Sequence, residues 1–257
     1  MHRSQGGWTA GGEPRVSTCT GKRRLIAWTA FGLLSALFPE GLAGQESRFP
    51  FPAHEELDYS IAWPSGLAVG TAELRARHSG PGWRFEMRIR ASVPKIDIDH
   101  AFVSRTNELL CSLDFEKHIR HGTKRAHETL RFGGGTLHRT NLDANDRAAP
   151  GTVPIADCAR DALATVFSLR RDLADGRIPP PEEIYFGAAY RLQLEYKQTR
   201  WLAWDSDRRQ ADEIRIDVRG PDSHHVFSAF FGRDTARTPL LFVVESEDGP
   251  FTIKLVE

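Results

Sequence analysis

The sequence has few cysteines, no surplus of either charge and no hydrophobic run long enough to cross a membrane as a helix. Only three of its 257 residues are cysteine, and 34 lysines and arginines balance 34 aspartates and glutamates. A nucleic-acid-binding protein normally carries a basic surplus or stripe, so we expect no nucleic-acid partner. The longest apolar run, residues 25–38, is shorter than the roughly 20 residues that a spanning helix needs.

Motifs of the common enzyme classes are also missing. The sequence has no Gly-x-Ser-x-Gly pattern, the mark of the α/β-hydrolase nucleophile. The run Gly133-Gly134-Gly135 is followed by Thr136-Leu137-His138, whereas a phosphate-binding loop needs Lys and then Ser or Thr. No alternation of strands and helices repeats along the chain, which argues against a parallel, doubly wound sheet. We therefore expect no cofactor and name no catalytic residue.

The N-terminal segment has the pattern of a secretory signal. Lys22-Arg23-Arg24 precede the apolar residues 25–38, and Leu42-Ala43-Gly44 supplies the small residues of a cleavage site. We expect residues 1–44 to be an N-terminal extension and signal peptide, and residues 45–257 to be a single β-rich domain. The mature protein would then be periplasmic or secreted, with no membrane span. An uncleaved membrane anchor is the alternative.

Most of the remaining chain has the period of two that is typical of strands. Between residues 83 and 91, apolar side chains alternate with charged ones: Trp83, Phe85, Met87 and Ile89 against Arg84, Glu86, Arg88 and Arg90. Such alternation predicts a strand with one face toward the core and the other toward water or a ligand. Similar short segments follow until the C-terminus, separated by turn sequences.

The segment from Cys111 to Phe132 predicts a hairpin whose register can be specified. Gly122-Thr123 suits a two-residue turn of type II′, which pairs residues whose numbers sum to 245. Apolar residues then face apolar residues, and charges mostly face opposite charges. The predicted pairs are Leu113 with Phe132, Asp114 with Arg131, Phe115 with Leu130, Glu116 with Thr129, Lys117 with Glu128, His118 with His127, Ile119 with Ala126 and Arg120 with Arg125.

A single helix is predicted after residue 157. Asp157 is the expected N-cap, apolar residues recur at helical spacing from Ala159 to Leu173, and Gly176 followed by Pro179-Pro180-Pro181 ends the helix. With ten or more strands and one helix, the chain is predicted to be mainly β (α+β). We expect a curved antiparallel sheet or half-barrel with one central amphipathic helix; a two-sheet β-sandwich is the alternative.

Four motifs resemble a bacterial family known as domain of unknown function 3108 (DUF3108). They are Leu57-x-Tyr59 followed by Gly66 and Gly70; Asp161-Ala162-Leu163 through Leu169-Arg170 to Leu173-x-x-Gly176; Asp234-x-x-Arg237-Thr238-Pro239-Leu240; and Gly249 to Leu255. The resemblance implies an exported protein, and it implies no reaction and no catalytic residues. By architecture the family is similar to half-barrel carriers of the bacterial envelope that shuttle lipoproteins or lipids.

Histidines and carboxylates provide the candidate chemistry. In the predicted hairpin His118 faces His127, within reach of one metal ion, and Glu116 is the nearest third ligand. Two solvent-exposed histidines without a metal are the commoner outcome, so we commit to no metal site. Asp97 and Asp99, beside His100, could form a glycosidase-like carboxylate pair, but a solvent-exposed strand edge is again commoner. Asp234 and Arg237 are expected to form a structural turn or ion pair.

The two cysteines of the predicted mature chain, Cys111 and Cys158, leave two interpretations open. In an oxidising compartment they can form a disulfide, or they can be two separate buried thiols.

Two functional hypotheses follow. The first is a non-enzymatic exported protein that binds a lipid, another apolar ligand or an envelope protein through its curved sheet, since aromatic residues are numerous enough to line an apolar groove. The aromatic residues in question are Trp63, Trp83, Phe85, Tyr190, Tyr196, Trp201, Trp204, Phe227, Phe230 and Phe231. The second is an envelope-polymer hydrolase that uses carboxylates or a histidine pair.

Overall fold

The structure is a computed structural model that describes residues 49–93, 96–141, 151–204, 207–245 and 249–256. The predicted extension and signal peptide, residues 1–44, and most of the predicted loop 141–151 lie outside the described residues. The elements are β1 (His54–Ala62), β2 (Ala68–Ser79), β3 (Gly82–Val93), β4 (Ile96–Asn107), β5 (Ser112–His121), β6 (Lys124–Gly133), β7 (Thr136–Asn141), β8 (Gly151–Pro154), β9 (Arg160–Asp161), α1 (Ala162–Ala174), β10 (Glu182–Tyr185), β11 (Ala189–Trp204), β12 (Asp207–Arg219), β13 (His224–Gly232), β14 (Pro239–Val244) and β15 (Phe251–Leu255).

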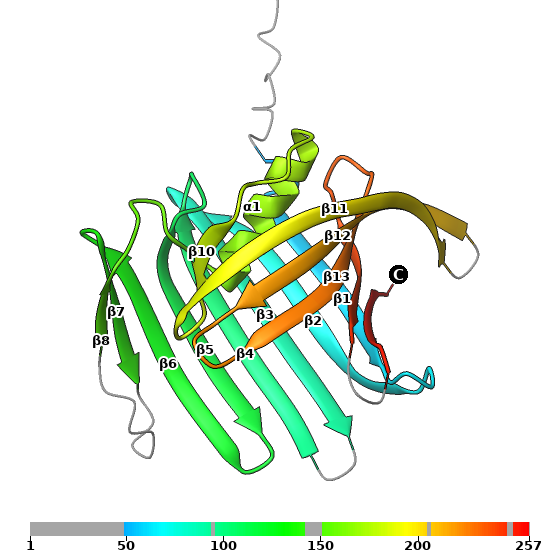
Figure 1. Ribbon diagram of the computed structural model, residues 1–257, viewed down its shortest axis with the longest axis horizontal. Helices are drawn as coiled ribbons and strands as arrows, with labels where there is room; N and C mark the ends of the chain where they lie inside the picture. The colour runs from blue at the N-terminus through cyan, green and yellow to red at the C-terminus, as the bar shows by residue number, and fades with distance from the viewer. Residues whose placement is uncertain (1–48, 94–95, 142–150, 205–206, 246–248, 257) are drawn as a thin grey trace, which may run out of the picture. The chain divides into compact units, whose positions relative to one another are not determined.

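All fifteen described strands belong to one sheet (Figure 1), in the order β8 to β1 and then β15 to β9. Strands that are consecutive in sequence pair with each other, except β8 and β9, which form the two edges of the sheet. In addition, β1 pairs antiparallel with β15 and so joins the two ends of the domain. Only the two-residue β9 pairs in parallel, with β10. The prediction of a curved antiparallel sheet with one helix is confirmed, and the β-sandwich alternative is wrong because the described strands form a single sheet.

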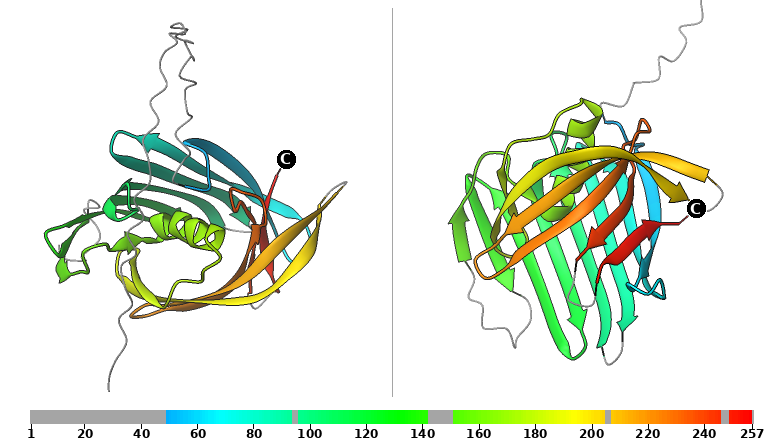
Figure 2. Two further views of the ribbon diagram at one scale, coloured as in Figure 1. Left: turned by 90° about the horizontal axis from the view of Figure 1, so that it is seen from above. Right: turned by 45° about the vertical axis from the view of Figure 1, so that its right-hand side comes forward.

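The sheet curls around the helix. Seen from above, β11 to β13 form one wall, β2 to β5 form the opposite wall, and α1 lies between them (Figure 2). The helix contacts β3 and β4 on one side and β10 on the other. Alternate side chains of a strand point to opposite faces of the sheet. Because the apolar residues alternate with polar ones, both walls place apolar side chains on the concave face, toward the helix.

The predicted hairpin is confirmed in its register. β5 and β6 pair from Asp114 with Arg131 to His121 with Lys124, and Gly122 in the turn has φ +60°. The predicted pair of Leu113 with Phe132 is not part of this ladder, which begins at Asp114 with Arg131, and the side chain of Leu113 is exposed. Between β4 and β5, Arg105 pairs with Asp114 and Thr106 pairs with Ser112, so Leu113 is the extra residue of a β-bulge.

The helix begins later than predicted. Asp161, and not Asp157, is the N-cap, since its carboxylate accepts hydrogen bonds from the backbone N–H groups of Leu163 and Ala164 at 2.9 Å. Residues Arg160–Asp161 are extended because they pair with β10. Gly176 follows the helix with φ +71°, as predicted for its end. Among the described residues, no helix is long and apolar enough to cross a membrane.

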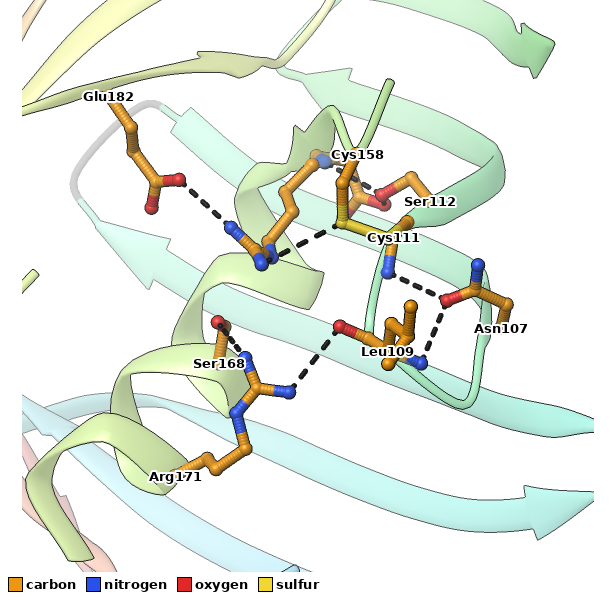
Figure 3. The surroundings of a disulfide bond; sticks show 10 residues. Asn107, Leu109, Cys111, Ser112, Cys158, Ser168, Arg171 and Glu182 are labelled. Atoms are coloured by element: carbon orange, nitrogen blue, oxygen red, sulfur yellow. Dashed lines mark hydrogen bonds and ion pairs between the residues drawn. A yellow bond between two sulfur atoms is a disulfide. The ribbon is translucent and has the colours of Figure 1, made fainter. Parts of the chain in front are cut away.

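A disulfide between Cys111 and Cys158 ties the β9 end of the sheet to the start of β5 (Figure 3), with Cα atoms 4.7 Å apart. Next to it, the backbone N–H of Ser112 donates to the carbonyl of Ala159 at 3.0 Å. The hydroxyls of Ser104 and Ser112 donate to the buried carboxylate of Asp161 at 2.6 and 2.5 Å. The N-cap of α1 is therefore also a link between the two walls, and these bonds hold the curled sheet around the helix.

Aromatic side chains fill the region beneath the helix. Phe167 of α1 stacks on Phe85 of β3 with ring centroids 3.9 Å apart, and Phe51 packs edge-on against Phe167 and Trp83. All four rings are buried. A second apolar cluster joins Leu169 and Leu173 of the helix to β10–β13. The helix is thus buried on two faces, one against each wall.

Candidate functional site

An apolar cavity of about 510 Å³ lies inside the curled sheet, beside α1. Such a volume is in the range of ligand-binding pockets in proteins. Its walls come from both arms of the sheet and from the helix. The apolar lining residues are Ala72, Leu74, Met87, Ile89, Phe102, Phe115, Ala162, Leu163, Val166, Leu169, Ile184, Phe186, Leu192, Leu194, Ile216, Val218, Phe227, Phe231, Phe242, Val244 and Ile253.

Strand periodicity explains why these residues meet. On β3, Ile89 lines the cavity while its neighbours Arg88 and Arg90 form ion pairs with Asp99 and Glu73 on the other face. On β11, Leu194 lines the cavity and Glu195 is exposed.

Of the aromatic residues that the sequence suggested for a groove, Tyr190, Phe227 and Phe231 line the cavity. Trp83, Phe85, Trp204 and Phe230 are buried elsewhere, and Tyr196 and Trp201 are exposed.

The polar side chains along the cavity are mostly occupied by protein partners. The hydroxyl of Tyr59 donates to the carbonyl of Pro239 at 2.9 Å, and burial raises its pKa. The hydroxyl of Thr165 donates to the backbone oxygen of Asp161 at 2.7 Å. The cavity therefore presents mainly hydrocarbon to whatever occupies it.

One end of the cavity carries polar side chains and reaches solvent. His225 lines the cavity and is exposed, so the cavity reaches solvent near the start of β13. Tyr190 lies at the same end, and Gly220 makes room for its ring, because a Cβ there would lie 2.3 Å from the Tyr190 ring. A ligand with an apolar body and a polar head would place its head here.

A buried ion pair lies behind Phe186 of the cavity wall. Lys117 of β5 and Glu128 of β6 are both on the inner face, with Nζ 2.7 Å from Oε2, and Arg139 also contacts Glu128. The ammonium of Lys117 lies 4.9 Å from the ring centroid of Phe186, a favourable cation–π distance. The hairpin register places Lys117 opposite Glu128 on an otherwise apolar strand face. The pairing could therefore be predicted from the sequence, but the burial of the pair was not predicted.

We expect this pair to make stability depend on pH. Burial raises the pKa of Glu128, but hydrogen bonds from Lys117 and Arg139 outweigh it and lower the pKa below its usual 4.5. Glu128 therefore stabilises the fold above pH 4.5, and this contribution is lost as the pH falls through the lowered pKa. At neutral pH, Glu128→Gln should lower the free energy of unfolding by about 1–3 kcal/mol.

Urea denaturation of the parent and of Glu128→Gln across a pH series measures this difference, which should shrink steadily below pH 4.5. The exposed Glu195→Gln serves as the control and should change stability little. A constant difference between the parent and Glu128→Gln at every pH would contradict the assignment.

On the outer face of the same hairpin, His118 and His127, the two candidate metal ligands of the sequence, lie together. The rings of His118 and His127 stack with centroids 3.7 Å apart. The Nε2 atoms of both rings contact the same Oε1 of Glu116, at 2.8 and 2.9 Å. Beside them is a hollow of about 390 Å³, which is lined by Arg88, Asp99, Ala101, His118, Ile119, Arg120, Arg125, Ala126 and His127.

The structure does not bring the other candidate carboxylates together as a reactive pair. Asp97 accepts a hydrogen bond from the hydroxyl of Ser92 at 2.9 Å, and Asp99 lies between Arg88 and Arg120. His100, next to Asp99 in sequence, packs against Phe102 and has a lowered pKa because of burial and the neighbouring His121.

The charged residues of the sequence motifs have structural partners. Asp234 accepts hydrogen bonds from the backbone and hydroxyl of Thr238, and Arg237 donates to Asp212 at 2.9 Å. The buried guanidinium of Arg170 donates to both oxygens of Glu55, at 2.5 and 2.8 Å. Glu55 is 115 residues away in the sequence, and it was not predicted as the partner of Arg170.

Comparison with known proteins gives a family without an assigned activity. A family model described as "Protein of unknown function (DUF3108)" matches residues 58–256. No curated protein matches the chain. The fold is similar to the crystal structure of a β-barrel-like protein of domain of unknown function DUF1849 from Brucella abortus. The TM-score is 0.58 at 11% sequence identity, over 80% of this chain and 96% of that chain.

Two further solved structures show weaker similarity. They are a candidate lipoprotein from Parabacteroides distasonis, with TM-score 0.32 and 8% identity, and a candidate exported protein with a YmcC-like fold from Bacteroides fragilis, with TM-score 0.31 and 9% identity. Each match covers 80% of this chain and 96% of the other.

Proposed function

The chain belongs to the DUF3108 family of proteins of unknown function, and we propose that it is an exported, non-enzymatic protein that binds an apolar ligand inside its curled sheet. The ligand class that fits best is a molecule with a long acyl chain and a polar head, such as a fatty acid or a lipid. The chain would lie between the two walls beside α1, and the head would lie near His225 and Tyr190.

The observation that carries this proposal is the cavity itself. Protein interiors are normally close-packed, with few voids larger than a water molecule. A hydrocarbon-lined space of about 510 Å³ that stayed empty would forgo the dispersion contacts of all its lining side chains. An acyl chain would restore those contacts, and each buried methylene would contribute about 0.8 kcal/mol.

Export is supported by the cysteine pair and by the predicted signal peptide. Disulfides form and persist mainly in oxidising compartments such as the bacterial periplasm, and Cys111 and Cys158 form one in the structure. The bond lies where it holds the curled sheet around the helix. We therefore place the working protein outside the cytoplasm, where lipids move between membranes.

The hydrolase hypothesis has less support. Asp99 is engaged by two arginines and Asp97 by a serine, so neither carboxylate is held toward a substrate. The apolar cavity lies on the opposite face of the sheet from these groups and offers no reactive pair of its own among the described residues.

A fluorescence titration tests the proposal. The full chain is expressed with its own N-terminus, purified from the export compartment and stripped of bound lipid by passage over an apolar resin. We expect cis-parinaric acid to bind saturably with one site and with a Kd on the order of 1 μM, which corresponds to about 8 kcal/mol. Palmitate should displace the probe. A folded protein that shows no saturable binding would refute the proposal.

A further inference from the structure

We propose that Glu116, His118 and His127 form a binding site for a divalent first-row transition metal of the zinc class on the outer face of the β5–β6 hairpin. The site is separate from the apolar cavity, because these side chains lie on the face opposite to Phe115 and Leu130. It therefore does not depend on the function proposed above.

The three candidate ligand side chains converge on one point. Cross-strand pairing puts His118 directly opposite His127, and Glu116 lies two residues before His118 on the same face of β5. One oxygen of Glu116 is 2.8 Å from Nε2 of His118 and 2.9 Å from Nε2 of His127. The three candidate ligand atoms all lie within 4.8 Å of one another.

The spacing of the donor atoms is close to that around a zinc ion. Ligand atoms about 2.0–2.1 Å from a tetrahedral zinc ion are roughly 3.3 Å apart from one another. The distances from the Glu116 oxygen to the two ring nitrogens are only a few tenths of an ångström shorter. Small torsional changes of these three partly exposed side chains would therefore admit an ion.

The chemical nature of the donors favours a transition metal. Two imidazole nitrogens and one carboxylate oxygen suit zinc, copper and nickel, whereas calcium and magnesium prefer sets of oxygen ligands. The side chains of His118, Glu116 and His127 are 48%, 42% and 31% exposed, so water can complete the coordination. The strands that carry them are held by β4 and β7 on either side, which fixes the spacing of the donors.

The charges around the site oppose a cation only in part. Arg88 and Arg120 both lie against Asp99, at 3.3 and 3.4 Å, which offsets their charge. Arg125 pairs with Arg120 across the hairpin and adds positive potential. We therefore expect micromolar affinity, weaker than that of closed structural zinc sites, which supply four protein ligands.

Isothermal titration of the full chain, purified without a histidine tag, with zinc chloride tests the site. Cobalt(II) absorption supplies a second readout of the coordination. We expect one zinc ion to bind per chain, and His118→Ala or His127→Ala to weaken binding at least tenfold. Glu116→Ala should weaken it by a smaller factor.

His138→Ala is the matched control. His138 is an exposed histidine on the neighbouring strand β7, and its ring contacts Thr136 and Thr152. This variant should bind zinc as the parent does. Circular dichroism confirms the fold of each variant. A parent chain that binds no zinc up to about 1 mM, or binding that survives both His118→Ala and His127→Ala, overturns the proposal.

Discussion

Replacing Arg170 with methionine should lower the free energy of unfolding by about 3–5 kcal/mol, the usual cost of leaving one partner of a buried ion pair alone. The guanidinium is completely buried. It donates to both oxygens of Glu55 and to the backbone carbonyl of Ala236. It also lies 4.8 Å above the ring of Phe51. One side chain thus joins the helix to β1 and to the turn before β14.

Urea denaturation of the parent and the variant measures this effect. Arg177→Met is the control, since Arg177 is an exposed arginine that pairs with Asp172 and Asp175 just after the helix, and exposed pairs add little. The double variant Arg170→Met/Glu55→Leu should recover part of the lost stability, because it leaves no buried charge unpaired. Equal effects of Arg170→Met and Arg177→Met would contradict this account of the core.

Replacing Leu194 with tryptophan should weaken binding of an acyl ligand at least tenfold while the protein stays folded. Leu194 lies on β11, and its side chain is part of the cavity wall. The larger indole would occupy the space that the ligand needs. In a packed core such an enlargement would cost about 1–3 kcal/mol, but here the cavity can accept it. The cis-parinaric acid titration described above gives the affinity.

The control is Glu195→Trp, which adds the same side chain one residue further along the same strand, on the exposed face. It should bind ligand as the parent does. On the opposite wall, Ile89→Trp and Arg90→Trp form a second matched pair, since Ile89 lines the cavity and Arg90 faces outward to Glu73. If both cavity variants bind as tightly as their controls, the ligand does not occupy this cavity.

Local patterns were enough to predict much of the fold. The register of the β5–β6 hairpin follows from one turn, Gly122-Thr123, and from the match of side chains across the strands. The juxtaposition of His118 and His127 follows from that register. The end of the helix at Gly176 follows from residue chemistry alone.

Features set by distant parts of the chain were harder to predict. The helix begins at Asp161 because Arg160 and Asp161 first pair with β10, and because Ser104 and Ser112 hold the Asp161 carboxylate. The helical spacing of apolar residues after Asp157 gives no information about these long-range contacts. The choice between a curled sheet and a sandwich depends on the pairing of β1 with β15, at opposite ends of the domain.

The sequence predicted that the sheet would have a concave apolar surface, but it did not predict which residues line the cavity. Abundant aromatic residues and alternating strands suggested a concave apolar surface, and the sequence could not tell which rings fill the core and which line a space. Phe85, for example, stacks on the helix, whereas Phe231 lines the cavity. The curvature of the sheet and the position of α1 decide this, and both depend on the whole fold.

Native mass spectrometry of the full chain, expressed with its own N-terminus and purified from the export compartment without detergent, tests the central claim most directly. We predict a mass greater than that of the processed polypeptide, and an excess that is extracted by organic solvent and fragments as a lipid. The same excess should be missing from Leu194→Trp and present in Glu195→Trp. A parent protein with the bare polypeptide mass would contradict the claim that this fold carries an apolar ligand.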